Sequence, residues 1–226
     1  MLLASVPQVL AHGQSLYQEY TTRLLFIVGI GGLILLSLVL YTLATQNKRK
    51  KIIFSAIVVI TLLTTVYLLI GTTYINHKSF TKGPVHWHAD FEVWECGRQI
   101  ELKDPEGISN KVGSMVVHEH NDNRIHIEGV LLTKEEGEIE EFIESIGGEL
   151  TATSLKVPTQ EGMQELKRCS KDAQLQVFAY QTRNGKVSQR KLDNPQEYLI
   201  SPHSQVPSGD CIIFEMDSPK EKTTLS

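Results

Sequence analysis

The sequence lacks the motifs that place many chains in a known class of enzyme or domain. It has three cysteines and no Cys-x-x-Cys pair, which excludes zinc ribbons of the cytosolic type. It has no glycine-rich loop for a phosphate group, no internal repeat and no low-complexity tract. No spacing indicates a Ser-His-Asp or Cys-His catalytic arrangement. The function must therefore be read from what the chain does contain.

A basic patch is also missing. Of the 226 residues, 22 are Lys or Arg and 26 are Asp or Glu, which gives a net charge of −4. Five of the basic residues but only one acidic residue precede Thr72, so the part from Thr72 onward carries 17 basic and 25 acidic side chains. An acidic surface repels phosphate groups. We therefore expect no nucleic-acid partner.

Charge is absent from two long apolar runs, at residues 24–44 and 52–71. A helix needs about 20 residues to cross the hydrocarbon core of a bilayer, because each residue rises only about 1.5 Å. The few hydroxyl side chains in the runs can hydrogen-bond to their own helix. Without a carboxylate, a cation or a histidine in either run, nothing indicates an ion pathway. The runs predict a transmembrane hairpin over 24–71 that anchors the chain in a lipid bilayer.

A short basic loop separates the two runs. Its four cations are Lys48, Arg49, Lys50 and Lys51. Short basic loops stay on the cytoplasmic side of a membrane. We therefore expect a two-helix protein of the cell membrane, with loop 46–51 in the cytoplasm and both the N-terminal segment 1–23 and the C-terminal domain outside. Residues 1–11 end in a small-residue pattern, so they could be a signal remnant, although they lack a basic start.

The remaining chain predicts a mainly-β (α+β) domain with one clear helix. Residues 85–94 alternate between apolar and polar side chains, as a strand does. A capping box at Thr133 and Glu136 opens an amphipathic helix, which Gly147 and Gly148 end. Further strands are expected at 114–120, 124–130, 149–156, 174–181, 186–192 and 210–216. The expected domains are the segment 1–23, the hairpin 24–71, a linker at 72–84, an extracytoplasmic β domain at 85–217 and a disordered tail at 218–226.

Five of the eight histidines fall within 41 residues of this domain. They are His86, His88, His118, His120 and His126. Residues two apart on a strand point to the same side, so His86 and His88 share a face with Asp90, and His126 shares one with Glu128. A short loop at 121–123 places His118 opposite His126, at a cross-strand distance of about 5 Å.

Such convergence suits a divalent transition metal, which takes three or four nitrogen and oxygen ligands at about 2.0–2.2 Å. The candidate ligands are His86, His88, His118, His120, His126, Glu128 and Asp90. Imidazole ligands suit zinc, copper, iron or nickel and do not choose between them, whereas calcium prefers oxygen ligands. Asp122 lies in the loop and is interpreted as a turn former. The leading hypothesis is an anchored protein that binds, senses or transfers zinc or copper.

Two other functions remain open. The first is a metal-dependent enzyme, in which histidines hold the ion and a carboxylate such as Glu128 or Asp90 acts as a base. The second is an adhesion or assembly domain without a metal, whose histidines form a solvated polar face. A cupin barrel is a weaker alternative, because Glu128 follows His120 by eight residues rather than by three or four.

Four stretches of the chain carry a resemblance to known sequences. They read GPVHWHADFEVWECG, VHEHNDNRIHIEGV, IGGEL and PSGDCIIFEM. Together they resemble a group of uncharacterised prokaryotic membrane-anchored or secreted proteins with a His-x-His strand and a His-x-His…Ile-His-x-Glu hairpin. The resemblance covers residues 83–216 and implies that the histidine motifs belong to one domain. It implies no activity.

The cysteines are expected to be oxidised, because thiols outside the cytoplasm tend to pair. Cys169 precedes one predicted strand and Cys211 begins another, so we predict a disulfide between Cys169 and Cys211. Cys96 is then left over, as a buried thiol, a soft ligand near the histidines or an intermolecular link.

Overall fold

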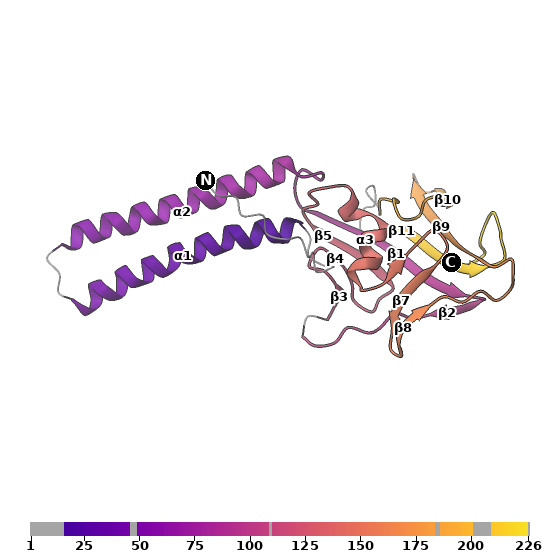
Figure 1. Cartoon of the computed structure of the whole chain (residues 1–226). Helices are drawn as coiled ribbons and strands as arrows, with labels where there is room; N and C mark the ends of the chain where they lie inside the picture. Colours follow the sequence, from indigo (N-terminus) through magenta and orange to yellow (C-terminus); the bar gives the residue numbers. More distant parts are fainter. Residues whose placement is uncertain (1–15, 46–48, 109, 184–185, 201–208, 226) are drawn as a thin grey trace, which may run out of the picture.

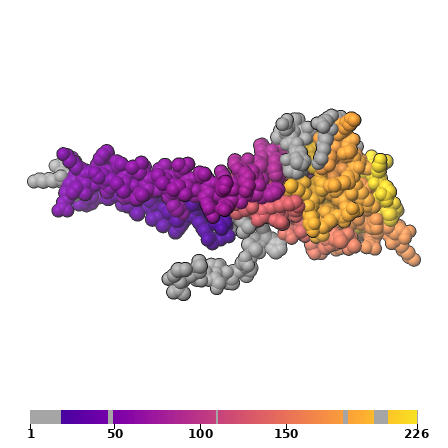
Figure 2. All heavy atoms as spheres, turned by 90° about the horizontal axis from the view of Figure 1, so that it is seen from above, coloured from indigo at the N-terminus to yellow at the C-terminus, as the bar shows by residue number. Residues whose placement is uncertain are grey.

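Two long helices precede a β domain in the structure, which is a computed structural model that describes residues 16–45, 49–108, 110–183, 186–200 and 209–225. Helices α1 (Leu16–Ala44) and α2 (Lys50–Lys78) pack side by side and project from one end of the domain (Figures 1 and 2). Both are long and apolar enough to cross a membrane. The expected signal remnant at 1–11 and residues 46–48 of the basic loop lie outside the described residues.

The surface of the hairpin is apolar. The side chains of Phe26 and Leu43 are 70% and 78% exposed, which is the opposite of a helix in a soluble core. Polar side chains in the helices are satisfied locally, as the sequence predicts. For example, the hydroxyls of Ser37 and Thr64 donate to carbonyls four residues earlier, each at 2.8 Å. The helices therefore need no polar partner from their surroundings.

Helix α2 is longer than the sequence predicts, because it continues through the first half of the predicted linker to Lys78. The remaining linker is tied to the domain. The backbone N–H of Phe80 donates to the carbonyl of Leu132 at 3.1 Å, and the N–H of Leu131 donates to the hydroxyl of Thr81 at 3.2 Å. The end of α2 is thus held close to the first strand of the domain.

The domain is built on a mixed sheet. Among the described residues its strand order is β10-β9-β11-β1-β5-β4-β3, with β2 also paired to β1 (Figure 1). The strands are β1 (Val85–Glu95), β2 (Arg98–Ile100), β3 (Val112–Gly113), β4 (Val117–Glu119), β5 (Arg124–Gly129), β9 (Gln174–Arg183), β10 (Lys186–Lys191) and β11 (Asp210–Asp217). Strands β1 and β11 are parallel, and their other neighbours are antiparallel. A smaller sheet holds β6 (Glu149–Leu150), β7 (Leu155–Thr159) and β8 (Gly162–Glu165); the strand expected at 149–156 is therefore divided into two.

The hydrophobic core lies on one face of the main sheet. Alternate residues of the central strands, such as Phe91 and Ile125, are at most 2% exposed. Helix α3 (Ile139–Ser145) packs on this face, where the rings of Phe91 and Phe142 meet edge to face at 5.2 Å. Strand alternation therefore sends the histidines of β1 and β5 to the opposite face.

The capping box before α3 is partly formed. The carboxylate of Glu136 accepts the backbone N–H of Thr133 at 3.2 Å. The chain first makes a 3₁₀ turn, η1 (Glu135–Gly137), and α3 begins two residues after it. The one clear helix of the prediction is thus present but shorter than expected.

The C-terminal residues differ from the expected disordered tail. Thr223 is only 5% exposed. The hydroxyl of Tyr180 on β9 donates to the carbonyls of Thr223 and Leu225, at 3.2 and 2.9 Å. The side-chain amide of Gln189 on β10 donates to the Thr223 carbonyl at 2.8 Å. Hydrogen bonds from side chains of β9 and β10 therefore hold the C-terminal residues against the sheet.

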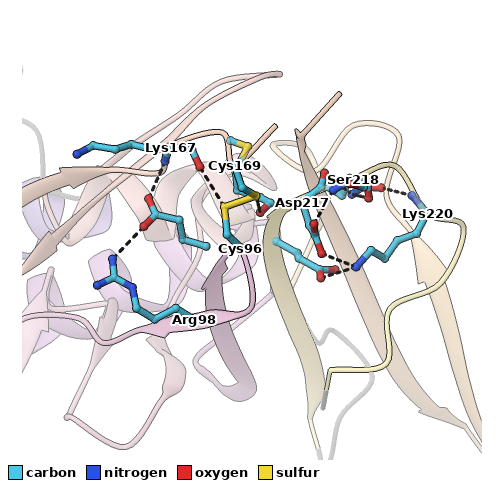
Figure 3. Close-up of a disulfide and its surroundings, with 11 residues drawn as sticks. Cys96, Arg98, Lys167, Cys169, Asp217, Ser218 and Lys220 are labelled. Atoms are coloured by element: carbon cyan, nitrogen blue, oxygen red, sulfur yellow. Dashed lines mark hydrogen bonds and ion pairs between the residues drawn. A yellow bond between two sulfur atoms is a disulfide. The ribbon is translucent and has the colours of Figure 1, made fainter. Parts of the chain in front are cut away.

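The predicted disulfide between Cys169 and Cys211 is wrong. Cys169 is bonded to Cys96 (Figure 3), and Cys211 is a free thiol. The parallel pairing of β1 and β11 explains the difference. It places Cys211 level with Asp90 and Met216 level with Glu95, immediately before Cys96. Cys211 therefore lies about 20 Å along the strand from Cys96. Burial, together with the nearby Glu92 and Asp90, raises the pKa of the Cys211 thiol to about 11, which keeps it protonated.

We expect Cys96→Ser and Cys169→Ser to lower the free energy of unfolding by about 2–4 kcal/mol, because each removes a cross-link between residues 73 apart. Cys211→Ser keeps the cross-link and serves as the matched control. Peptide mapping of unreduced protein should find one alkylated cysteine, Cys211. A peptide that links Cys169 to Cys211 would contradict this assignment.

Candidate metal centre

Two antiparallel pairings bring the histidines together. Strand β1 pairs with β5 so that His86 faces Glu128 and His88 faces His126. Strand β4 pairs with β5 so that His118 also faces His126, which confirms the cross-strand pair expected from the sequence. His126 therefore lies between His88 and His118 on the middle strand.

Three of the histidines and one carboxylate form a compact group. The ligand atoms of His86, His88, His126 and Glu128 all lie within 4.8 Å of one another. A tetrahedral ion with ligands at about 2.1 Å needs donor atoms about 3.4 Å apart. Small changes of side-chain rotamer are therefore enough to bring four donors around one ion. Three imidazoles and one carboxylate suit zinc or copper better than calcium.

Glu128 lies close to two of the histidines. One of its carboxylate oxygens is 3.0 Å from Nε2 of His86 and 3.9 Å from Nδ1 of His126. The side chains of His86 and Glu128 are 60% and 43% exposed, whereas that of His126 is 12% exposed. The group is therefore open to solvent on the side of His86 and closed on the side of His126.

Asp122 determines which nitrogen of His126 can bind an ion. Its carboxylate lies 3.1 Å from Nε2 of His126. Burial alone would raise the pKa of Asp122, but the hydrogen bond and the charge of His126 hold it below its usual value. An ionised carboxylate only accepts, so Nε2 carries the proton and Nδ1 carries the lone pair. That Nδ1 is buried without a hydrogen-bond partner among the described residues. Metal-binding histidines are commonly oriented by a carboxylate in this way.

Asp122 also keeps the role in the turn that the sequence suggests, because its other oxygen accepts the backbone N–H of Arg124 at 3.2 Å. Its contact with His126 is not evident from the sequence. The sequence signal that could have shown this contact is the spacing. His126 follows Asp122 by four residues, across the short loop that leads into β5.

His118 is the most buried of the five histidines. It is 2% exposed, and burial, with a smaller contribution from the charge of Lys111, lowers its pKa to about 4. His88 is 6% exposed, and burial followed by the neighbouring His126 and His86 lowers its pKa as well. Both imidazoles are therefore neutral at neutral pH, which is the form that binds metals.

His120 follows β4 and closes the cluster. Its ring is 4.8 Å from that of His118 and 4.8 Å from that of His126. Nδ1 of His120 lies 2.5 Å from the carbonyl oxygen of Asn110. A carbonyl only accepts, so Nδ1 carries the proton and Nε2 is left as the ligand atom.

Asp90 is not brought into the compact group. Its carboxylate is paired with the guanidinium of Arg124 at 2.6 Å, beyond His88 along β1. It shares the face that strand alternation predicts, but the antiparallel register gives it a cationic partner instead of an imidazole.

Two glycines let the backbone pass close to the histidines. Gly113 has φ +121°, and a Cβ there would lie 2.6 Å from the carbonyl of Val117 and 2.8 Å from Cα of His118. A Cβ on Gly209 would collide with the carbonyl of His88. The strands that carry His118 and His88 are thus packed against chain segments that tolerate no side chain.

The pKa of His118 predicts a loss of stability in acid. The unfolded chain takes up a proton below about pH 6.5, and the folded chain takes it up only below about pH 4. Stability is therefore complete above pH 6.5, falls as the pH drops to about 4 and then levels off. For metal-free full-length protein in detergent with a chelator, we expect His118→Gln to weaken this dependence by up to about 3 kcal/mol.

The measurement is thermal unfolding of the β domain across this pH range, followed by near-ultraviolet circular dichroism. His77→Gln is the matched control, because His77 is exposed at the end of α2 and should leave the profile unchanged. An identical profile for His118→Gln and the natural chain would contradict the assignment.

Comparison of the chain with protein-family models, with curated proteins and with solved structures gives no match. No family is therefore assigned, and the functional argument depends on the geometry of the histidine cluster.

Proposed function

We propose that this chain is a membrane-anchored, extracytoplasmic protein that binds zinc or copper through its clustered histidines, for binding, sensing or transfer of the ion. The observation that carries this proposal is the compact group formed by His86, His88, His126 and Glu128. Strands β1 and β5 place these residues on the face opposite the hydrophobic core, so the group lies outside that core.

The protonation of the group supports a metal ligand role. The carboxylate of Asp122 directs Nδ1 of His126 into the group as an acceptor, and burial keeps His88 neutral. Nδ1 of His126 is buried without a hydrogen-bond partner among the described residues, which destabilises the fold by about 1–3 kcal/mol. The alternative function, in which the histidines form only a solvated polar face, gives no reason for this cost.

A membrane anchor is supported by the hairpin. Its apolar side chains are exposed along its length, and a bilayer is the solvent that such a surface requires. Helix α2 begins with Lys50, preceded by Arg49. The start of α2 is at the end of the hairpin far from the β domain (Figure 1). The preference of basic loops for the cytoplasm places the domain outside. Strand β1 begins seven residues after α2 ends, so the histidines lie close to the outer membrane surface.

Cysteine labelling tests this orientation. In a Cys211→Ser background the chain has no free thiol, because Cys96 and Cys169 are bonded to each other. We expect a membrane-impermeant maleimide to label Lys171→Cys in intact cells. Lys50→Cys should react only after the cells are permeabilised. Labelling of Lys50→Cys alone in intact cells would reverse the proposed orientation.

Zinc titration tests the metal site. We expect the double change His86→Ala and Glu128→Gln to weaken the tightest Zn²⁺ binding of the full chain in detergent by at least about tenfold, because two of four ligands are lost. Both side chains are largely exposed, so the fold should survive. His77→Ala removes an exposed histidine elsewhere and should bind like the natural chain. Equal affinity in the double variant would refute the proposed site.

A further inference from the structure

The five imidazole rings cannot all serve one ion. The lone pair of an imidazole nitrogen lies in the plane of its ring, so an ion sits close to the plane of each ring that binds it. Two rings can share an ion only where their planes intersect. The angles between the rings therefore divide the cluster.

His126 belongs with His88. Their rings are 4.6 Å apart and inclined at 86°, and the rings of His86 and His88 are 4.5 Å apart and inclined at 61°. These planes cross, which agrees with the compact group of donor atoms around Glu128.

His118 does not belong with His126. Their rings are stacked, with centroids 5.6 Å apart and an angle of only 5° between the planes. Stacked parallel planes do not meet near the rings, so the two lone pairs do not converge on one point. His118 is thereby separated from the group that His126 serves, although the two rings are in contact. The planes of His120 and His126 also cross, at 77°. The lone pair of His126 is nevertheless on Nδ1, which lies 3.9 Å from the Glu128 carboxylate, so it is directed to the compact group.

His118 does belong with His120. Their rings are 4.8 Å apart and inclined at 80°, so their planes cross. Nδ1 of His118 is buried and has no hydrogen-bond partner among the residues that the structure describes. The hydrogen bond of His120 to Asn110 leaves its Nε2 free to bind an ion. The pair therefore offers two nitrogen atoms as ligands.

We propose that His118 and His120 form a second binding position for a transition-metal ion. It lies beside the group of His86, His88, His126 and Glu128, where the ring of His118 stacks against that of His126. The inference rests on the proposed function only for the class of ion. With two protein ligands the ion must complete its coordination with solvent, so this position is the weaker of the two. A tight and a weak position in contact are suited to passing an ion from one to the other.

Zinc titration of metal-free full-length protein in detergent micelles, by calorimetry and equilibrium dialysis, tests the proposal. We expect the natural chain to bind two Zn²⁺ ions, the second at least tenfold more weakly. His120→Ala should bind one ion, with the affinity of the tight position unchanged. His77→Ala, the matched loss of an exposed histidine, should still bind two.

His118→Gln is a second variant for the same position, and near-ultraviolet circular dichroism checks that it is folded. The proposal is overturned if the natural chain binds a single ion. It is also overturned if His120→Ala still binds two ions, or if the tight position weakens in that variant, because His120 would then belong to one shared site. Failure of the proposed function has a different result, namely tight binding that survives the change of His86 and Glu128.

Discussion

The register between β1 and β5 is the constraint on which the site depends. It pairs His86 with Glu128 and His88 with His126, while the alternate residues Ala89 and Ile125 enter the core. A slip of one residue would turn every side chain of a strand to the other face. The buried apolar residues therefore fix the positions of the histidines, although they never touch an ion.

The same fold also determines which nitrogen atoms of the imidazole rings carry a proton. Asp122 and the carbonyl of Asn110 each accept a hydrogen bond from one imidazole N–H, and burial keeps His118 and His88 neutral. In the proposed site the unprotonated nitrogens would donate their lone pairs to the ion. The apolar hairpin would attach the domain to a membrane.

Much of this arrangement could be predicted from the sequence, because it depends on local patterns. Apolar runs predicted the two helices, and alternation predicted which face carries the histidines. The disulfide and the role of Asp90 could not be predicted, because both depend on which strands pair and in what register. The parallel pairing of β1 with β11 places Cys211 far from Cys169. The pairing of β1 with β5 places Asp90 beside Arg124, with which it forms an ion pair. The contact of Asp122 with His126 could not be predicted either, because an Asp in a turn is expected to bond to its own backbone.

X-ray absorption at the zinc edge of the full chain loaded with one equivalent of Zn²⁺ tests the central claim most directly. We expect a shell of about four nitrogen and oxygen neighbours at about 2.0–2.1 Å, with the outer-shell scattering that imidazole rings produce. That imidazole signal should diminish when His88 is replaced. A shell of oxygen atoms without imidazole scattering, unchanged by loss of His88, would contradict a histidine metal centre.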